Sequence, residues 1–597
     1  MPDCPYCNTE SQTDGELTAH LEDAHSREEL SRIDRKRVEK HAADSGARSR
    51  LGRVVPDGRL SRRAALVGAG TVLAGIGVGI GSRMSQSSPT PIQNWTDLDD
   101  VRTGLSDDYV LANDLDQSTT GYSGTGDDFD PIGDTGNRFQ GTFDGNGHTI
   151  SDLTIEVAFN QSGPLLAGLF GATDGSAEIK NLTIAGANVT YEDRLSDGDG
   201  GAFIIGANAG TVRNVSASGS LEAVGANEAG CVVGLNTGTV RNVSASGSLV
   251  VDDAFEVGGV VGLNKGIITG SVSDATLSKK GGNVGDVGGL VGTQEGGTVE
   301  DCVATGKVSV EDTRIGGLVG TNDFGGSEIR DSYATGDVIN GTRDAGGLVG
   351  SNQDDMAVVE RCYATGTVTS NANGSGFGGL VGKNSNGTVQ ESYATGNINA
   401  SNAESVGGLA GRNDGGDATI TRSYAIGEVN GDTAVGGVVG GNIHDFGSPV
   451  IKRSYAAGTV QGNTEVGGLV GRNQDSGGDH GILEDSYWDT TTTGQGDAVG
   501  VSGAENNLAG LTTSQMQGTA ARTNMSAFDF NSIWTAVVTD QQINPVPDSG
   551  GYPVLGALDI NQQLGTQGIG LLPTVAAIEV DGADNTTINN VTVGNGN

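Results

Sequence analysis

Aromatic residues make up only 4% of this 597-residue chain, which also contains just 5 cysteines. So few aromatic side chains exclude large aromatic-filled cores, and so few cysteines over this length exclude a disulfide framework. Basic residues are scarce as well: 34 lysines and arginines stand against 74 aspartates and glutamates, for a net charge of −40. A charge of this sign repels nucleic acid and anionic lipid, so no nucleic-acid partner is expected. It suits a protein that stays hydrated in very high salt.

Glycine is abundant instead, at 102 residues, and much of it belongs to a repeat. The glycines follow no G-X-Y period, which excludes collagen. The pattern Gly-Gly-[Leu/Val]-Val-Gly recurs, with small variations, at spacings of 28 to 35 residues. The last glycines of its eleven copies are Gly171, Gly206, Gly234, Gly262, Gly292, Gly320, Gly350, Gly382, Gly411, Gly440 and Gly471. A period of this length indicates a solenoid of equivalent structural units.

Each copy predicts three short strands separated by turns. The motif itself is one strand, a second precedes a tight turn as in Asp331–Gly336, and a third follows as in Asp337–Ile339. No copy contains a continuous 3.6-residue apolar stripe, so helical repeats are excluded. Three strands close into one coil of a β-helix, and successive coils stack about 4.8 Å apart. We therefore predict an all-β fold, a right-handed parallel β-helix (solenoid) of about 11 coils.

These repeats resemble the GLUG motif, named for Gly-Leu-x-Gly, as in Gly347–Gly350. The lead-in with Trp95 and Phe139–Ile150, and the endings Ser486–Gly494 and Gly510–Gln517, are similar to the same family. The resemblance covers roughly residues 92–555. It implies a surface protein, since the family includes adhesins and some immunoglobulin-cleaving metallopeptidases. The sequence contains no H-E-x-x-H, so the peptidase domain of those proteases is not in evidence.

Two kinds of side chain recur at fixed positions in the repeat. An amide follows the last motif glycine by two residues and predicts a hydrogen-bonded ladder at a turn. Its members are Asn208, Asn236, Asn264, Gln294, Asn322, Asn352, Asn384, Asn413, Asn442 and Asn473. A tyrosine recurs in six successive copies, at Tyr333, Tyr363, Tyr393, Tyr424, Tyr455 and Tyr487.

The neighbours of these tyrosines are small, as in Ser332 and Ala334. Strand alternation then places the small residues inside the coil and the rings outside, where we expect them to be exposed. Exposed stacked rings are a candidate sugar-binding ladder, because a sugar face packs on an aromatic face. The alternative, which we favour, is that the rings stack on one another and protect a corner.

A second pattern lies at the start of the chain, where Cys4, Cys7, His20 and His25 have the spacing C-x2-C-x12-H-x4-H. It resembles the C2H2 zinc finger, a small ββα fold that places two thiolates and two imidazoles around Zn²⁺. The core aromatic that this family has after the second cysteine is Ser11 here. A single finger whose helix carries Glu16 and Glu22 is poorly suited to DNA.

An uncharged stretch at residues 64–82 follows Arg62 and Arg63 and is just long enough to cross a bilayer. The arginine pair before a weakly apolar segment is similar to a twin-arginine export signal. Basic residues cluster before it and acidic residues dominate after it, which predicts a cytoplasmic N-terminus and an extracellular, cell-surface remainder. We expect this segment to form one hydrophobic helix. No A-x-A cleavage site is visible, so cleavage and retention as a membrane anchor both stay open.

The sequence therefore divides into eight predicted segments. They are a zinc-finger-like segment (1–30), a basic cytoplasmic helix or linker (31–60), the export or anchor segment (61–83), a linker (84–91), an N-terminal cap with the first coils (92–165), the repeat solenoid (166–500), a C-terminal cap (501–560) and a tail (561–597).

Two function classes are compatible with this organisation. We favour a non-enzymatic surface protein, acting in adhesion or as a structural or binding rod for extracellular glycans or partner proteins. The alternative is a carbohydrate-active β-helix enzyme, a polysaccharide lyase or hydrolase. An enzyme breaks its repeat where acid, base and cation converge, whereas the coils from Gly234 to Gly471 are nearly interchangeable. We therefore expect no catalytic residues.

Three minor features complete the sequence. The aspartate-rich turns Gly126–Asp130 and Ser196–Gly200 are candidates for Ca²⁺, with solvation in salt as the alternative. Cys302 and Cys362 occupy equivalent inward positions two coils apart, beyond disulfide reach, and are expected in the core. Asn-x-Ser/Thr sequons are frequent and become possible glycan sites if the chain is exported; they include Asn94, Asn181, Asn214, Asn242 and Asn524.

Overall fold

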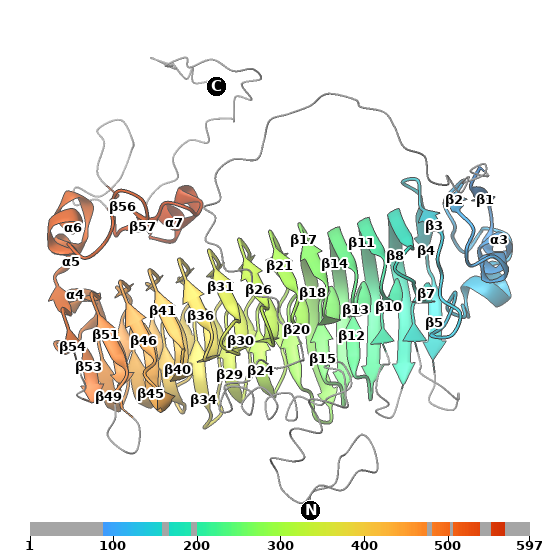
Figure 1. Ribbon diagram of the computed structural model, residues 1–597. Helices are drawn as coiled ribbons and strands as arrows, with labels where there is room; N and C mark the ends of the chain where they lie inside the picture. Colours follow the sequence, from blue (N-terminus) through green and yellow to red (C-terminus); the bar gives the residue numbers. More distant parts are fainter. Residues whose placement is uncertain are drawn as a thin grey trace, which may run out of the picture. The chain divides into compact units, whose positions relative to one another are not determined.

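The computed structural model describes residues 88–157, 166–192, 200–474, 480–501, 505–537 and 551–567. All of them belong to one compact unit, Gln86–Asn597. They form the predicted all-β parallel solenoid, in which short strands repeat coil after coil (Figure 1). The segments expected at 1–30, 31–60 and 61–83 lie outside the described residues.

Two sheets of the solenoid contain one strand from each coil, paired in parallel with the equivalent strands of the neighbouring coils. Sheet I has 11 strands: β6 Leu166–Ala167, β9 Gly200–Gly201, β12 Glu228–Gly230, β15 Glu256–Gly258, β19 Asp286–Gly288, β24 Thr313–Gly316, β29 Arg343–Gly346, β34 Ser375–Gly378, β39 Glu404–Gly407, β44 Thr433–Gly436 and β49 Thr464–Gly467. Sheet II has 12 strands: β7 Phe170–Ala172, β10 Ile205–Asn208, β13 Val233–Asn236, β16 Val261–Asn264, β20 Val291–Glu295, β25 Val319–Asp323, β30 Val349–Gln353, β35 Val381–Ser385, β40 Ala410–Gly416, β45 Val439–Gly447, β50 Val470–Arg472 and β53 Val499–Val501.

Sheet III is the largest, with 32 strands. Its lead-in and early strands are β1 Thr90–Ile92, β2 Tyr109–Leu111, β3 Thr142–Asp144, β4 Thr149–Ser151, β5 Thr154–Val157, β8 Glu178–Glu192, β11 Thr211–Val224, β14 Thr239–Asp252, β17 Ile267–Thr269 and β18 Val272–Gly281. Later coils contribute triplets: β21 Thr298–Glu300, β22 Val303–Ala304, β23 Val308–Ser309, β26 Glu328–Arg330, β27 Tyr333–Ala334, β28 Val338–Ile339, β31 Val358–Glu360, β32 Tyr363–Ala364, β33 Val368–Thr369, β36 Thr388–Gln390, β37 Tyr393–Ala394, β38 Ile398–Asn399, β41 Thr419–Thr421, β42 Tyr424–Ala425, β43 Val429–Asn430, β46 Val450–Lys452, β47 Tyr455–Ala456 and β48 Val460–Gln461. The sheet ends with β51 Ile482–Glu484, β52 Tyr487–Asp489, β54 Glu505–Asn506 and β55 Ala509–Leu511.

Sheet II extends one coil beyond the eleven motif copies. Its additional strand, β53, pairs Val499 with Val470 of the preceding coil. The segment Gly496–Gly500 keeps the first and last glycines of the motif and Val499, but has Asp497 and Ala498 where most copies have Gly and Leu or Val. A Cβ atom added to Gly500 would lie 2.2 Å from the carbonyl carbon of Glu465, so this strand also approaches the backbone of sheet I closely.

The motif glycines are required because the backbones of sheets I and II approach each other closely. A Cβ atom added to Gly350 would lie 2.5 Å from the carbonyl carbon of Arg314 and 2.6 Å from the amide nitrogen of Ile315. One added to Gly346 would lie 2.1 Å from the carbonyl oxygen of Val349. These obstacles are backbone atoms, so a side chain fits only if the strands separate. The conserved spacing of glycines along this chain is therefore a packing requirement.

The interior of the coils is filled mainly by small aliphatic side chains, such as Ile315, Leu318 and Val319, which are fully buried. This explains why the aromatic fraction of the chain is low. Aromatic rings concentrate at the N-terminal end, where the centroids of Phe139 and Phe143 lie 4.9 and 5.3 Å from that of Phe170.

The lead-in carries its own short helix, α3 (Trp95–Asp100). The ring of Trp95 is fully buried and lies edge-on to Tyr122, with 5.6 Å between centroids. The 3₁₀ turn Val101–Thr103 (η2) and the π turn Tyr122–Gly126 (η3) follow. These aromatic residues therefore pack together at the N-terminal end of the described solenoid.

One residue per coil adopts a left-handed conformation at the same corner of sheet III. The members of this column are Asn181, Asn214, Asn242, Gly270, Asp301, Asp331, Arg361, Glu391, Arg422, Arg453, Asp485 and Asn507, each with positive φ. Asparagine and glycine adopt this conformation at little cost, whereas arginine and glutamate are less suited to it. The corner is thus imposed by the stacking of coils and not by local preference alone.

The C-terminal cap, defined as residues 512–537 and 551–567, follows the last strand of sheet III. It contains α5 (Thr513–Met516), α6 (Gly518–Asn524) and α7 (Ile560–Thr566), after α4 (Thr490–Thr493) at the end of the solenoid. The short strands β56 (Trp534–Thr535) and β57 (Val554–Leu555) pair in antiparallel fashion. This cap lies along the outer face of sheet III (Figure 1).

Candidate functional site

The tyrosine ladder forms a continuous stack on the outside of sheet III. Each ring is parallel to the next within 6°, and centroids are 4.5 to 5.0 Å apart from Tyr333 to Tyr455. The rings project away from the aliphatic interior and form a separate cluster with residues of the C-terminal cap. The predicted outward direction and the predicted mutual stacking are both confirmed.

The predicted exposure of these rings is wrong for most of the ladder. Tyr393, Tyr424 and Tyr455 are 0% exposed, and Tyr487 is 3% exposed. Tyr363 is also buried, and Tyr333 is half-buried. The residues that cover them belong to the C-terminal cap.

The cover is itself aromatic. The centroid of Trp534 lies 5.7 Å from Tyr455 and 6.2 Å from Tyr424, and that of Phe528 lies 5.1 Å from Tyr487. The Tyr455 hydroxyl donates to the carbonyl oxygen of Pro553 at 2.7 Å.

Further polar contacts secure the same interface. The Tyr424 hydroxyl donates to Gln563 Oε1 at 3.0 Å, and burial raises the pKa of both Tyr424 and Tyr455 well above its ordinary value. The ladder is the docking face of the C-terminal cap, so rings from Tyr393 onward are not available to a sugar.

The amide ladder is confirmed as a structural element. Its side chains are buried, and each Nδ2 donates to the carbonyl oxygen of the amide one coil later at 2.7 to 2.8 Å, with one interruption. At its N-terminal end Thr173 Oγ1 donates to Asn208 Oδ1 at 2.8 Å. At the other end Asn473 Nδ2 donates to the carbonyl oxygen of Gly481 at 3.0 Å.

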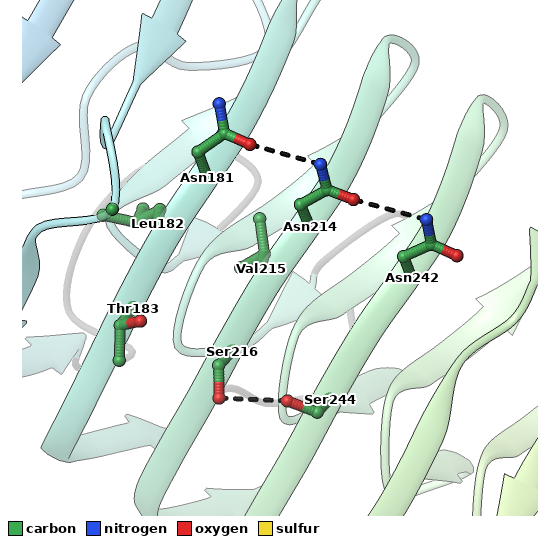
Figure 2. A pocket seen from close by; sticks show the side chains of 9 residues that line it. Asn181, Leu182, Thr183, Asn214, Val215, Ser216, Asn242 and Ser244 are labelled. Atoms are coloured by element: carbon green, nitrogen blue, oxygen red, sulfur yellow. Dashed lines mark hydrogen bonds between the residues drawn. The ribbon is translucent and has the colours of Figure 1, made fainter.

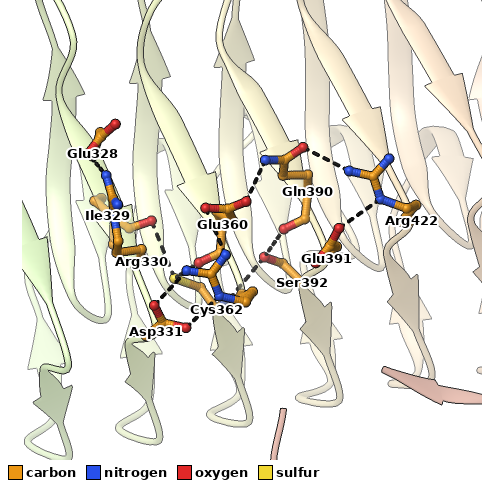
Figure 3. Close-up of polar contacts among 11 residues, drawn as sticks. Glu328, Ile329, Arg330, Asp331, Glu360, Cys362, Gln390, Glu391, Ser392 and Arg422 are labelled. Carbon is orange, nitrogen blue, oxygen red and sulfur yellow. Dashed lines mark hydrogen bonds and ion pairs between the residues drawn. The ribbon is translucent and has the colours of Figure 1, made fainter. Parts of the chain in front are cut away.

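Charged side chains of opposite sign form ion pairs along the outer corner of sheet III in the later coils (Figure 3). Arg361 makes two bonds to the Asp331 carboxylate, both 2.7 Å, and pairs with Glu360 at 2.9 Å. Two coils further, Arg422 Nε donates to Glu391 Oε1 at 2.9 Å, and its NH2 group donates to Gln390 Oε1. Arg361 thus lies between carboxylates of neighbouring coils that would otherwise repel one another. The few basic residues of the chain therefore offset part of its negative charge at this corner.

Three carboxylates stack in register on sheet I, an arrangement that the sequence did not reveal. Glu228 pairs with Glu256, and Glu256 pairs with Asp286, in consecutive coils. Burial, reinforced by the charges of its neighbours, raises the pKa of Glu256 to about 8. The Arg314 guanidinium pairs with Asp286 on the far side. A carboxyl group of this kind keeps its proton at neutral pH, which limits the repulsion within the stack.

The cysteines of the solenoid are core residues, as predicted. Cys231, Cys302 and Cys362 are buried free thiols. Burial raises the pKa of each to about 12, so none is a ready thiolate nucleophile.

The remaining predicted site residues lie outside the described residues: Cys4, Cys7, His20 and His25 as zinc ligands, and Arg62 and Arg63 of the export signal. Within the described ranges no group of three or more His, Cys, Asp or Glu side chains is placed to hold a metal ion. These ranges include the Gly126–Asp130 turn, in which Asp127 accepts a hydrogen bond from the amide of Gly124. None of the helices that the structure describes is both long and apolar enough to cross a bilayer.

Comparison with known proteins agrees with this architecture. Four segments match the family described as the GLUG motif, at residues 283–309, 312–339, 341–369 and 402–430. Over 161 residues, 26% of the chain, the sequence is 35% identical to halomucin of Haloquadratum walsbyi. Over 141 residues, 23% of the chain, it is 34% identical to a Gly-rich membrane protein of Evansella cellulosilytica. The matched regions amount to 2% and 15% of the lengths of these relatives.

The family match coincides with the structural repeat. Each matched segment contains one strand of sheet I and the following strands of sheets II and III, as in 341–369, which spans β29 to β33. The four segments that match the GLUG motif therefore lie within the parallel β-solenoid.

Proposed function

We propose that this chain is an exported, non-enzymatic cell-surface protein, whose solenoid acts in adhesion or as a structural scaffold that binds extracellular glycans or partner proteins. The observation that carries the proposal is the continuous parallel pairing of sheet II, whose 12 strands all pair with their coil neighbours, with a register shift between Asp414 and Gly416. Side chains on such a surface recur once per coil and do not gather into a single binding or catalytic site. Repeated weak contacts of this kind gain strength through multivalency.

The names of the two relatives support an extracellular role. One is called halomucin and the other a Gly-rich membrane protein. The acidic outer surface supports the same role, because a net charge of −40 keeps a protein hydrated and soluble in high salt.

The N-terminal part of the proposal rests on sequence alone. Arg62 and Arg63 would direct export, and residues 64–82 would stay in the membrane as an anchor or be removed. Cys4, Cys7, His20 and His25 would hold one Zn²⁺ on the cytoplasmic side, where thiols stay reduced.

Protease treatment of intact cells that express the full chain tests the location. We expect the solenoid to be cleaved or released while residues 1–63 are protected. The double variant Arg62→Lys, Arg63→Lys should leave the whole chain protected, and Arg102→Lys, in the lead-in of the solenoid, is the matched control. A solenoid that resists protease in intact cells, yet is cut after lysis, would contradict export.

Incubation of the full chain with a panel of extracellular polysaccharides separates binding from turnover. We expect retention of one or more polysaccharides with no new chain ends. New reducing or unsaturated ends would overturn the non-enzymatic proposal in favour of a lyase or hydrolase.

A further inference from the structure

Three Asn-x-Ser/Thr sequons lie in register on consecutive coils of sheet III. Leu182, Val215 and Val243, the middle residues, pair with one another across β8, β11 and β14. The asparagines therefore form one column and the hydroxyl residues a second column beside it (Figure 2). We call this set the sequon strip; its members are Asn181, Thr183, Asn214, Ser216, Asn242 and Ser244.

The asparagine side chains of the strip point outward and are accessible. Asn214 and Asn242 are exposed, and Asn181 is half-buried. Asn214 Nδ2 donates to Asn181 Oδ1 at 3.2 Å, and Asn242 Nδ2 donates to Asn214 Oδ1 at 3.3 Å (Figure 2). An amide nitrogen has two hydrogens, so each of these bonds leaves the second hydrogen directed to solvent.

A shallow hollow of about 380 Å³ adjoins these amides. It is lined by the sequon strip together with Gly147, Leu182 and Val215. All of these residues are uncharged, although the chain carries a net charge of −40. The next two coils have Val272 and Val303 at the position of Ser244, and the following coil has Tyr333. The hollow thus lies beside coils that have small hydroxyl residues at this position. It offers room and polar groups beside the amides for a sugar residue.

We propose that the sequon strip is a site of N-linked glycan attachment, with Asn242 as its preferred acceptor. The proposal rests on the proposed export of the solenoid. A glycan donor activated as a lipid-linked phosphate would supply the sugar. A C–N bond forms between its anomeric carbon and Nδ2, the phosphate leaves with the bonding electrons, and one Nδ2 hydrogen leaves as a proton. The second Nδ2 hydrogen stays and continues to donate to the neighbouring amide.

Asn242 is preferred because it stands at the open end of the column. The next coil has Gly270 at this position, and a Cβ atom added there would lie 2.7 Å from Asn242 Oδ1. Gly270 has no side chain that could crowd Asn242, whereas Asn214 is flanked by an asparagine on each side.

Two other sequons provide internal comparisons because their amides are engaged. Asn524 Nδ2 donates to the carbonyl oxygens of Gln515 and Ala520, both at 3.1 Å, which uses both hydrogens. Asn94 is the N-cap of α3: its Oδ1 accepts from the backbone amides of Thr96 and Asp97, and its Nδ2 donates to Asp97 Oδ2 at 3.1 Å, so a glycan there would have to disturb the cap. We expect both asparagines to stay unmodified on the folded protein.

Glycopeptide mass spectrometry of the full chain, purified from the surface fraction of its natural host, tests the proposal. The decisive variant is Ser244→Ala, which destroys the sequon but leaves the asparagine column intact. Ser248→Ala is the matched control, because Ser248 belongs to no sequon. The two serines make similar hydrogen bonds to the preceding coil: Ser248 Oγ donates to Ser220 Oγ at 3.3 Å, and Ser244 Oγ donates to Ser216 Oγ at 3.0 Å.

We expect a glycan on Asn242 in the natural chain and in Ser248→Ala, reduced at least tenfold in Ser244→Ala. Surface-located protein with unmodified Asn242, or modification that persists in Ser244→Ala, overturns the proposal and leaves the proposed function standing. The fraction from which the chain is recovered reports on that function separately.

Discussion

Gln294 and Asn322 face each other in register on neighbouring coils, yet the amide ladder is interrupted between them. Among the described residues, neither Gln294 Nε2 nor Asn322 Oδ1 has a hydrogen-bond partner, although both atoms are buried. Every other ladder position is an asparagine, and those pairs bond at 2.7 to 2.8 Å. The extra methylene of glutamine displaces its amide nitrogen from the column.

Gln294→Asn should therefore restore the ladder and stabilise the protein. An unmade buried hydrogen bond costs on the order of 1–3 kcal/mol, and a restored one contributes about 1 kcal/mol. The midpoint of denaturant unfolding of the full chain is expected to rise. Asn352→Ala, which removes both bonds of a complete ladder position, should lower it. An unchanged midpoint in Gln294→Asn would show that water satisfies the two atoms.

Gly350→Ala should be strongly destabilising because its Cβ atom would meet backbone of the preceding coil at 2.5 Å. Overpacking of this kind costs about 1–3 kcal/mol or more. Gly496→Ala is the matched control, since a Cβ atom there has no described neighbour within 4 Å. Thermal unfolding of both variants measures the difference, and equal melting temperatures would contradict the close approach of sheets I and II.

Tyr455→Phe and Tyr393→Phe should have opposite outcomes although both rings are fully buried. Tyr455→Phe removes the bond from the hydroxyl to Pro553 and should cost about 0.5–1.5 kcal/mol. The Tyr393 hydroxyl is buried without a partner among the described residues, so Tyr393→Phe should be neutral or stabilising. Proteolysis of the C-terminal cap, faster in Tyr455→Phe alone, is the second readout. A loss of stability in Tyr393→Phe would contradict this account.

The repeat architecture could be predicted from sequence because its determinants are local and recur. Motif glycines such as Gly350 and ladder amides such as Asn352 mark the same backbone positions in coil after coil. The twelfth strand of sheet II escaped the pattern because Asp497 and Ala498 replace the second glycine and the Leu or Val of the motif, although Gly496, Val499 and Gly500 are kept.

The surroundings of the tyrosines could not be predicted in the same way. Their spacing fixes the direction of the rings, but burial depends on Phe528 and Trp534, which lie beyond the repeat and share no pattern with it. The column of left-handed residues could likewise be predicted only in part. Asn214 and Asn242 carry a recognisable preference for that conformation, whereas Arg361 and Arg422 adopt it without one. Alignment of the coils against each other is the signal that reveals it.

The N-terminal cysteine–histidine pattern predicts about one zinc ion per chain. Cys4→Ser should abolish zinc binding by the purified full-length protein, because three remaining ligands leave the tetrahedron open. His148→Ala, which removes a histidine of the solenoid that pairs with Asp114, is the control and should retain the metal. Elemental analysis after dialysis measures the stoichiometry. Zinc-free wild-type protein prepared in the presence of zinc would refute the prediction.

The carboxylate stack on sheet I predicts that stability falls as pH rises through neutrality. Burial raises the pKa of Glu256 to about 8, with further contributions from Glu228, Asp286 and Glu295 and an opposing one from Lys265. The pKa of a glutamate in an unfolded chain is about 4.3. Between these two limits the folded state holds one more proton than the unfolded state, so the free energy of unfolding declines, and the loss is complete above pH 8.

Glu256→Gln should remove this dependence, because the amide stays neutral at every pH. The variant is expected to gain on the order of 2–4 kcal/mol over the natural chain above pH 8. Near pH 4 the two should be similar, since Glu256 is then protonated in the folded state. Glu156→Gln, at an exposed position of β5, is the control and should keep the natural profile. Denaturant unfolding from pH 4 to pH 9 measures the profiles, and parallel curves for the natural chain and Glu256→Gln would exclude the stack as their cause.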